Sequence, residues 1–157
     1  MKNWPIIRTI LLGGTVAAAL DILFAITFAA YNGMEAERLL QVVASGALGQ
    51  AAFVGGHHSA ALGLLFHFLL SYLWAAIFFV IAWHVPALTR RPLLSGIGFG
   101  VIVFFAMRLV VLPLSAFPFP VTFKLFNSAM DLLSHMFLFG LPIAIATRKA
   151  LSTHLRA

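Results

Sequence analysis

The stretch NSAMDLLSHMFLFGLPIAIAT, from Asn127 to Thr147, decides the class of this fold. It is long enough to cross the ~30 Å hydrocarbon core of a bilayer, which takes roughly 20 helical residues. Lipid offers no water to backbone N–H and C=O groups, so a segment in that environment satisfies them internally, as an α-helix. Asp131 and His135 interrupt the apolar run. The stretch therefore predicts a membrane-spanning helix that carries a polar site.

Three further apolar runs lie earlier in the chain, at about 9–30, 60–83 and 93–112. The chain of 157 residues is 62% hydrophobic and only 9% charged, which is more apolar than a soluble domain of this size needs to be. It contains no cysteine, which excludes disulfides and thiolate chemistry. We predict an all-α integral membrane protein, a single transmembrane domain over residues 1–157 built as a four-transmembrane-helix bundle.

Basic residues gather at one end of the predicted bundle. They precede the first run, separate the second from the third and follow the fourth, whereas the other connections carry only Arg38 and Lys124. An excess of Lys and Arg marks the cytoplasmic side of membrane proteins. We expect both termini to be cytoplasmic, in the bacterial inner membrane. Because the net charge of +6 follows membrane topology, it does not indicate nucleic acid as a partner. The basic residues at this end are Lys2, Arg8, Arg90, Arg91, Arg148, Lys149 and Arg156.

The connection after the first run has a helical pattern of its own. Apolar residues from Leu39 to Ala51 recur at three- and four-residue spacing. This predicts an amphipathic outer-loop helix over about 35–53, which lies on or folds into the outer surface and caps the bundle. The second outer connection, at about 113–126, contains three prolines and is expected to pack at the interface as well.

Each predicted span carries an ionisable residue, and these residues fall at a common depth. Counted from the cytoplasmic ends at ~1.5 Å per residue, they lie roughly 20 to 25 Å from that side, in the outer half of the bilayer. Charged groups inside a membrane are costly and indicate function by default. The predicted polar pocket comprises Asp21, His67, Ser71, Arg108, Asp131 and His135.

The charges of this pocket limit its possible states. Arg108 keeps its proton, so at least one of Asp21 and Asp131 is expected to pair with it. The other aspartate is then protonated or paired with a protonated histidine, and such groups titrate as a set. The same residues also allow a purely structural interpretation, in which an Arg–Asp pair fixes the register of two helices.

Histidine and carboxylate side chains also suit metals. Asp131 and His135 are four residues apart on one helical face, and His67 could add a third ligand for zinc, iron or another divalent metal. Alternatively, His67 and His135 could ligate a haem from two helices. At the outer mouth of the second span, His57 and His58 could bind a surface metal together with nearby glutamates.

Motifs for nucleotide binding and hydrolysis do not occur in the sequence. There is no G-x-x-x-x-G-K-[ST], G-x-G-x-x-G, G-x-S-x-G or H-E-x-x-H. Gly96, Gly98 and Gly100 are instead typical of close helix packing in membranes. We expect no ATP-driven function, and enzymatic activity is less favoured than binding.

Residues from about 55 to 147 resemble the YagU-like family of small four-span bacterial inner-membrane proteins. That family has a Gly-His pair before its second span, a His with a Ser four residues later, a polar residue five before a proline, and an acid four before a His. The chain departs from the family pattern in having Arg where the family has His, Asp where it has Glu, one inserted histidine and a shorter first outer loop. The resemblance implies the fold and the polar site but no reaction. The matching residues are Gly56 with His58, His67 with Ser71, Arg108 before Pro113, and Asp131 with His135.

Three functions remain open. The first is a pocket that binds or moves protons, ions or a small solute. The second is a structural or assembly subunit of a larger membrane complex, and the third is a haem-binding redox protein. Because four short spans make a small pathway, we expect a homo-oligomer or a partner under each of them.

Overall fold

The computed structural model describes residues 4–154, with side chains described for residues 6–152, and the regular elements of this part are helices. Four helical segments are long and apolar enough to cross a membrane. Each contains one of the predicted runs and extends beyond it at both ends, because hydropathy marks only the apolar part of a helix. The prediction of an all-helical chain with four candidate spans is confirmed. The four segments are Ile6–Tyr31, Gly56–His84, Pro92–Leu114 and Leu125–Ser152.

Two of the long segments are regular and two contain a π-helical turn. The regular ones are α1 (Trp4–Tyr31) and α3 (Gly56–His84). The third segment consists of α5 (Pro92–Ala106), the π-helical η2 (Met107–Val111) and α6 (Leu112–Leu114). The fourth consists of α7 (Leu125–Ser134), the π-helical η3 (His135–Gly140) and α8 (Leu141–His154).

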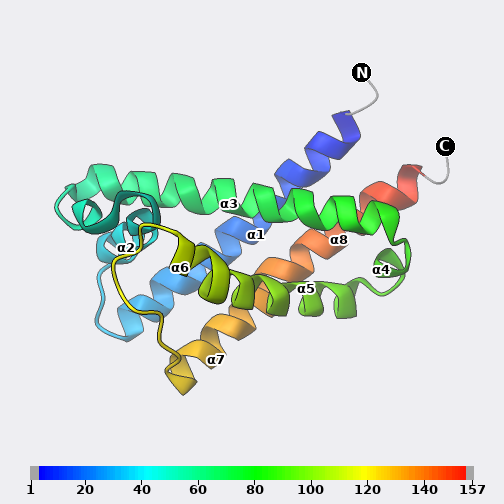
Figure 1. Cartoon of the computed structure of the whole chain (residues 1–157). Helices are drawn as coiled ribbons and strands as arrows, with labels where there is room; N and C mark the ends of the chain where they lie inside the picture. Colours follow the sequence, from blue (N-terminus) through cyan, green and yellow to red (C-terminus); the bar gives the residue numbers. More distant parts are fainter. Residues whose placement is uncertain (1–3, 155–157) are drawn as a thin grey trace.

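The long helices run up and down, so that the connections alternate between the two ends of the bundle (Figure 1). α1 contacts α3 on one side and α8 on the other, while α5 packs against η3 and α8. The start of α1, the end of α8 and the short helix α4 (Ala87–Arg90) lie at one end, here called the terminal end. The opposite end, called the α2 end, holds the connections 32–55 and 115–124.

Glycines bring α5 against η3. A Cβ atom on Gly100 would overlap the backbone of His135, and one on Gly140 would overlap the carbonyl oxygen of Gly96. Gly96 and Gly100 therefore have the packing role that the sequence predicts. Gly98 does not, because it lies on the opposite face of α5, where a Cβ would meet nothing within 4 Å.

The connection in which the sequence predicts a helix over about 35–53 contains α2 (Ala36–Leu48), followed by the 3-10 helix η1 (Gly49–Phe53). It is not one continuous α-helix, because Gly49 has a positive φ of 58° and turns the chain there. α2 packs along the first turns of α3, where Gly63 meets the backbone of Leu40.

The second connection covers α2 in turn. The N–H of Ala116 donates to the carbonyl oxygen of Gly46 at 2.9 Å, and the rings of Phe119 and Phe53 lie 5.5 Å apart. The two connections at the α2 end therefore form one packed layer.

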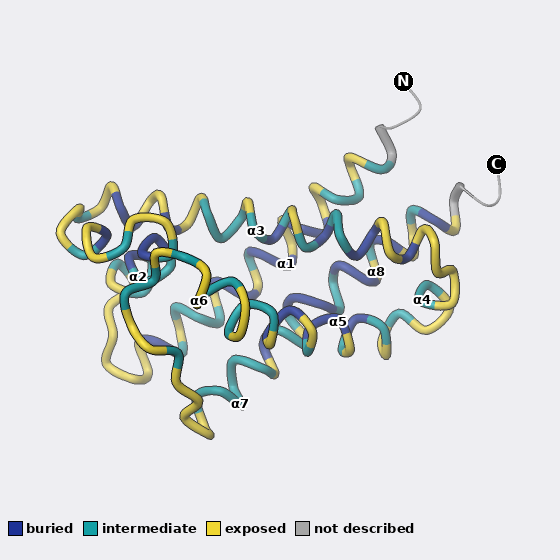
Figure 2. The backbone as a smooth tube through the Cα atoms, viewed as in Figure 1, coloured by how far each residue is buried: buried dark blue, intermediate teal, exposed yellow. Residues whose placement is uncertain are grey.

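The buried apolar core lies toward the terminal end (Figure 2). The outward helix faces are apolar too, as Leu94 and Ile102 illustrate with exposed fractions of 60% and 62%. Such a surface suits lipid better than water. The core consists of Ala17, Ala75, Phe78, Phe79, Ala82, Phe99, Val103, Phe139, Ile143, Ala144 and Leu151.

Candidate functional site

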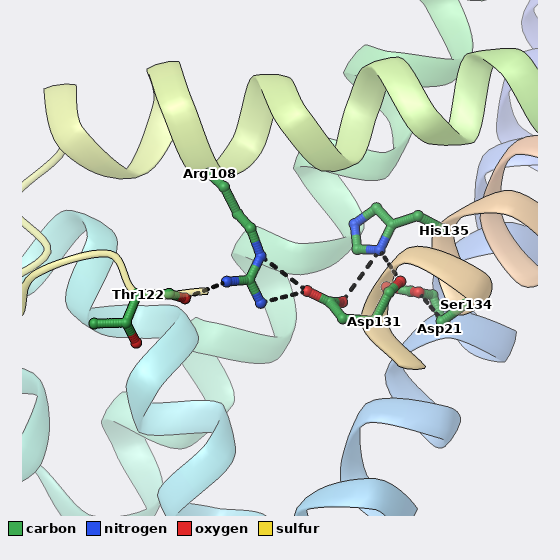
Figure 3. A network of polar contacts seen from close by, with 6 residues as sticks. All are labelled: Asp21, Arg108, Thr122, Asp131, Ser134 and His135. Carbon is green, nitrogen blue, oxygen red and sulfur yellow. Dashed lines mark hydrogen bonds and ion pairs between the residues drawn. The ribbon is translucent and has the colours of Figure 1, made fainter. Parts of the chain in front are cut away.

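Five of the six residues of the predicted pocket are ionisable, and they lie between the helices on the α2 side of the core. Figure 3 shows four of them: Asp21, Arg108, Asp131 and His135. They lie at two levels rather than one. Arg108 and Asp131 are each about six residues from the α2 end of their segments, whereas Asp21, His67 and His135 are about one helical turn deeper.

The outer level is an ion pair between the third and fourth segments. Nη2 of Arg108 donates to Oδ2 of Asp131 at 2.8 Å, and Nε donates to the same oxygen at 3.3 Å. The Arg108 and Asp131 side chains are 20% and 37% exposed. Of the two partners that the sequence allowed for Arg108, the structure therefore selects Asp131 rather than Asp21.

The remaining contacts of Arg108 reach the second connection. Its Nη1 donates to the backbone carbonyl of Thr122 at 2.9 Å. The guanidinium carbon lies 5.0 Å from the ring centroid of Phe104 and 5.4 Å from that of Phe123. Cations are attracted to aromatic faces at such distances. Arg108 thus joins the network to the layer that covers it.

His135 continues the network inward. Its Nδ1 lies 2.9 Å from the carbonyl oxygen of Asp131 and 3.2 Å from Oδ1 of the same residue. With Asp131 ionised, as its pairing with Arg108 favours, both atoms only accept, so Nδ1 carries a proton and donates it. The ring lies against Phe104 and Phe139, which hold it in place.

Asp21 is the deepest carboxylate, with an exposed fraction of 8%. Its Oδ1 accepts a hydrogen bond of 2.6 Å from the hydroxyl of Ser134. It also interacts electrostatically with both His67 and His135. Ser134 is missing from the predicted pocket, although a hydroxyl next to His135 inside an apolar run was a usable signal.

His67 is the residue that α3 contributes to the site. Its Nε2 donates to the backbone carbonyl of Ala18 at 3.0 Å, which fixes the protonated ring nitrogen because a carbonyl only accepts. Ser71 behaves differently from the prediction. Its hydroxyl donates to the carbonyl of His67 on its own helix at 2.8 Å, so it does not join the network through its side chain.

The three-ligand metal site considered for His67, Asp131 and His135 is not assembled. Among the described residues, no group of three or more His, Cys, Asp or Glu side chains could hold a metal ion. The reason is local: Nε2 of His67 is directed at α1, and Nδ1 of His135 at its own helix. A haem between the two histidines would require Nε2 of His67 to leave the carbonyl of Ala18 or the ring to turn.

Of the surface metal site predicted near His57 and His58, the structure shows only a contact between His57 and Glu37. Nδ1 of His57 lies 2.7 Å from a carboxylate oxygen of Glu37, with the imidazole 92% exposed. The amide of Gln41 donates to the Glu37 carboxylate and to the carbonyl of Gly56. These contacts fasten α2 to the start of α3.

The two π-helical turns coincide with the network. η2 contains Arg108, and η3 begins at His135. A π-turn inserts an extra residue into a helical turn and is frequent at functional sites. It rotates the following side chains relative to a regular helix, which spacing in the sequence does not reveal.

The network lies between the apolar core and the α2 end of the bundle. Toward the terminal end it is backed by the apolar core, where Phe99, Val103 and Ile143 are each 5% exposed or less. On the other side the second connection contacts Arg108, and the Asp131 side chain is partly exposed. The polar groups therefore lie nearer to the α2 end than to the terminal end.

No family model, curated protein or solved structure matches the chain.

Proposed function

We propose that the chain is a multi-pass membrane protein whose interhelical network binds protons together with an ion or a small solute. The observation that carries the proposal is the interhelical network itself, in and beside which ionisable groups from all four candidate spans gather. Ionisable groups inside a membrane are costly, and they indicate an ion pathway, a proton relay or a ligand site by default. The members are Asp21, His67, Arg108, Asp131 and His135.

The charge balance supports a proton-linked site. Arg108 and Asp131 neutralise each other. Asp21, His67 and His135 remain, and each of these side chains has a form with and a form without an additional proton. The proton count of these three residues can therefore change when a charged ligand arrives, because coupled groups titrate as a set.

The position of the network, toward one end of the bundle, favours binding over passage through a single chain. The apolar core continues from the network to the terminal end, so ions would find few polar groups on that route. Binding at one membrane face fits this geometry. Movement across the membrane would need a second copy of the chain or a partner, and we propose such an assembly only for that case.

The distribution of charges supports an orientation with the terminal end in the cytoplasm of a bacterium. Arg8, Arg90, Arg91, Arg148 and Lys149 lie at that end, against Arg38 and Lys124 at the α2 end. Positive residues favour the cytoplasmic side. The site would then lie toward the outer face of the inner membrane. Lys2 and Arg156, which also entered the prediction, lie outside the described residues.

The test compares purified wild-type protein in lipid nanodiscs with His135→Ala and with Ser128→Ala, a control on the same helical stripe that leaves the network intact. Native mass spectrometry and elemental analysis measure bound ions and small molecules, and infrared difference spectroscopy follows carboxyl protonation on acidification. We expect a bound species or a carboxyl signal that His135→Ala removes and Ser128→Ala keeps. Identical spectra and masses for all three proteins would overturn the proposal.

A structural role is the second candidate, and one observation favours it. The Arg108–Asp131 pair joins the third and fourth segments close to the contact between Gly100 and His135, where register matters most. In that case the pair serves assembly, and the chain is a subunit of a larger membrane complex.

A further inference from the structure

An apolar groove lies at the terminal end, away from the polar network. It is formed where the first turns of α1 stand away from the last turns of α3 (Figure 1). Its volume is about 290 Å³, near the lower end of the ~300–1,000 Å³ typical of ligand pockets. Its lining is aliphatic and aromatic with one polar exception, His84: Ile6, Ile10, Phe79, Val80, Trp83 and His84.

The position of the groove along the helices indicates which kind of molecule could occupy it. α3 ends at His84, so the groove begins where the span leaves the apolar region and continues along it toward Phe79. A Trp at such a level, here Trp83, is typical of the membrane interface. A long apolar chain with a polar head fits this arrangement better than a compact polar solute.

The charged residues at the terminal end indicate which lipid head group fits there. The four acidic residues of the chain, at positions 21, 35, 37 and 131, all lie away from the terminal end. Arg90 and Arg91 follow His84 closely in the chain and are exposed. Basic pockets at the cytoplasmic ends of membrane helices bind anionic lipid head groups. The terminal end, to which the groove belongs, is therefore complementary to a phosphate-bearing, negatively charged head.

We infer that this groove binds one acyl chain of an anionic phospholipid, with the lipid phosphate held at His84 in the field of Arg90 and Arg91. The inference rests on the membrane placement in the proposed function, but not on the polar network. The occupant comes from the leaflet that surrounds the terminal end. It is a specific lipid that stays with the protein, unlike the lipids that cover the outward faces.

The experiment fills the groove and leaves the rest of the helix unchanged. Val80→Trp places a large ring in the groove, and Leu69→Trp is its matched control. Leu69 lies about three turns earlier on the same face of α3 and is 52% exposed, against 55% for Val80. Protein in mild detergent is mixed with phosphatidylglycerol or phosphatidylcholine, and retained lipid is counted by native mass spectrometry. We expect retained phosphatidylglycerol in the wild type and Leu69→Trp and its loss in Val80→Trp.

A second variant tests the head group. Arg90→Gln with Arg91→Gln should weaken phosphatidylglycerol retention by about five-fold per arginine, because each surface cation contributes about that factor to anionic lipid binding. Equal retention in Val80→Trp and Leu69→Trp, or equal retention of phosphatidylcholine, would overturn the inference. A carbonate wash of the membranes separates this result from failure of the proposed function, since a chain released by the wash was never embedded.

Discussion

The polar half of the bundle, toward the α2 end, and the apolar half, toward the terminal end, are built from the same four helical segments and are held together differently. In the apolar half, rings of Phe78 and Phe99 meet at 4.8 Å between α3 and α5. In the polar half, charged hydrogen bonds such as that between Arg108 and Asp131 join the helices. Lipid tails are as apolar as side chains, so helix association in membranes depends on close packing and interhelical hydrogen bonds. Each half relies on one of these two.

This difference indicates which half of the bundle tolerates substitutions with the smaller loss of stability. A cavity in the apolar half can be filled by small shifts or by lipid. A missing partner in the polar half leaves a charge without compensation in a low-dielectric setting, which costs more. The boundary between the halves, where glycines bring two backbones together, tolerates least.

The largest effect is expected at that boundary, from Gly100→Ala. The new Cβ would overlap the backbone of His135, so α5 and η3 must move apart. We expect a loss of about 3 kcal/mol or more in the free energy of unfolding, at the upper end of the range for overpacked cores. The control is Gly98→Ala, two residues away, where the methyl group meets open space. Thermal unfolding in detergent measures both, and equal melting temperatures would contradict the close contact.

An intermediate effect is expected in the polar half, from Asp131→Asn. Asparagine keeps one oxygen that can accept from Arg108 but loses the negative charge that balances the guanidinium, and the partly exposed site reduces the penalty to about 1–3 kcal/mol. The double exchange Arg108→Asp with Asp131→Arg separates the two candidate functions. If the pair only fixes register, the exchange restores both stability and every binding signal. If the pair belongs to a ligand site, the exchange can restore stability but does not restore ligand binding.

The smallest effect is expected in the apolar half, from Phe99→Ala. Phe99 is 5% exposed and its ring packs on Trp74 and Phe78. In a soluble core this change costs about 3–5 kcal/mol, but much of that value is transfer from water. Separated helices in lipid keep the ring in an apolar medium, so we expect about 1–2 kcal/mol from lost packing. Chemical unfolding in nanodiscs measures it. A loss larger than that of Asp131→Asn would reverse the ranking of the halves.

The sequence alone could predict positions along the helix axis. The rise per residue is constant, so counting from basic ends placed Asp21, His67, Arg108, Asp131 and His135 in one half of the bundle. The four apolar segments and the helix in the first connection also follow from local pattern. The same count spread the residues over roughly 20 to 25 Å, and the prediction treated this spread as a single depth.

What the sequence by itself determined is therefore the helical class, the four candidate spans, the basic end and the approximate depth of the polar residues. The tertiary structure decided which aspartate pairs with Arg108. It also decided that Ser134 donates a hydrogen bond to Asp21 and that His67 donates one to the carbonyl of Ala18. The physical reason is rotation about the helix axis. Helix packing and the two π-turns set that rotation. Every residue has a backbone carbonyl that can accept a hydrogen bond, so no side-chain pattern shows which carbonyl His67 will use.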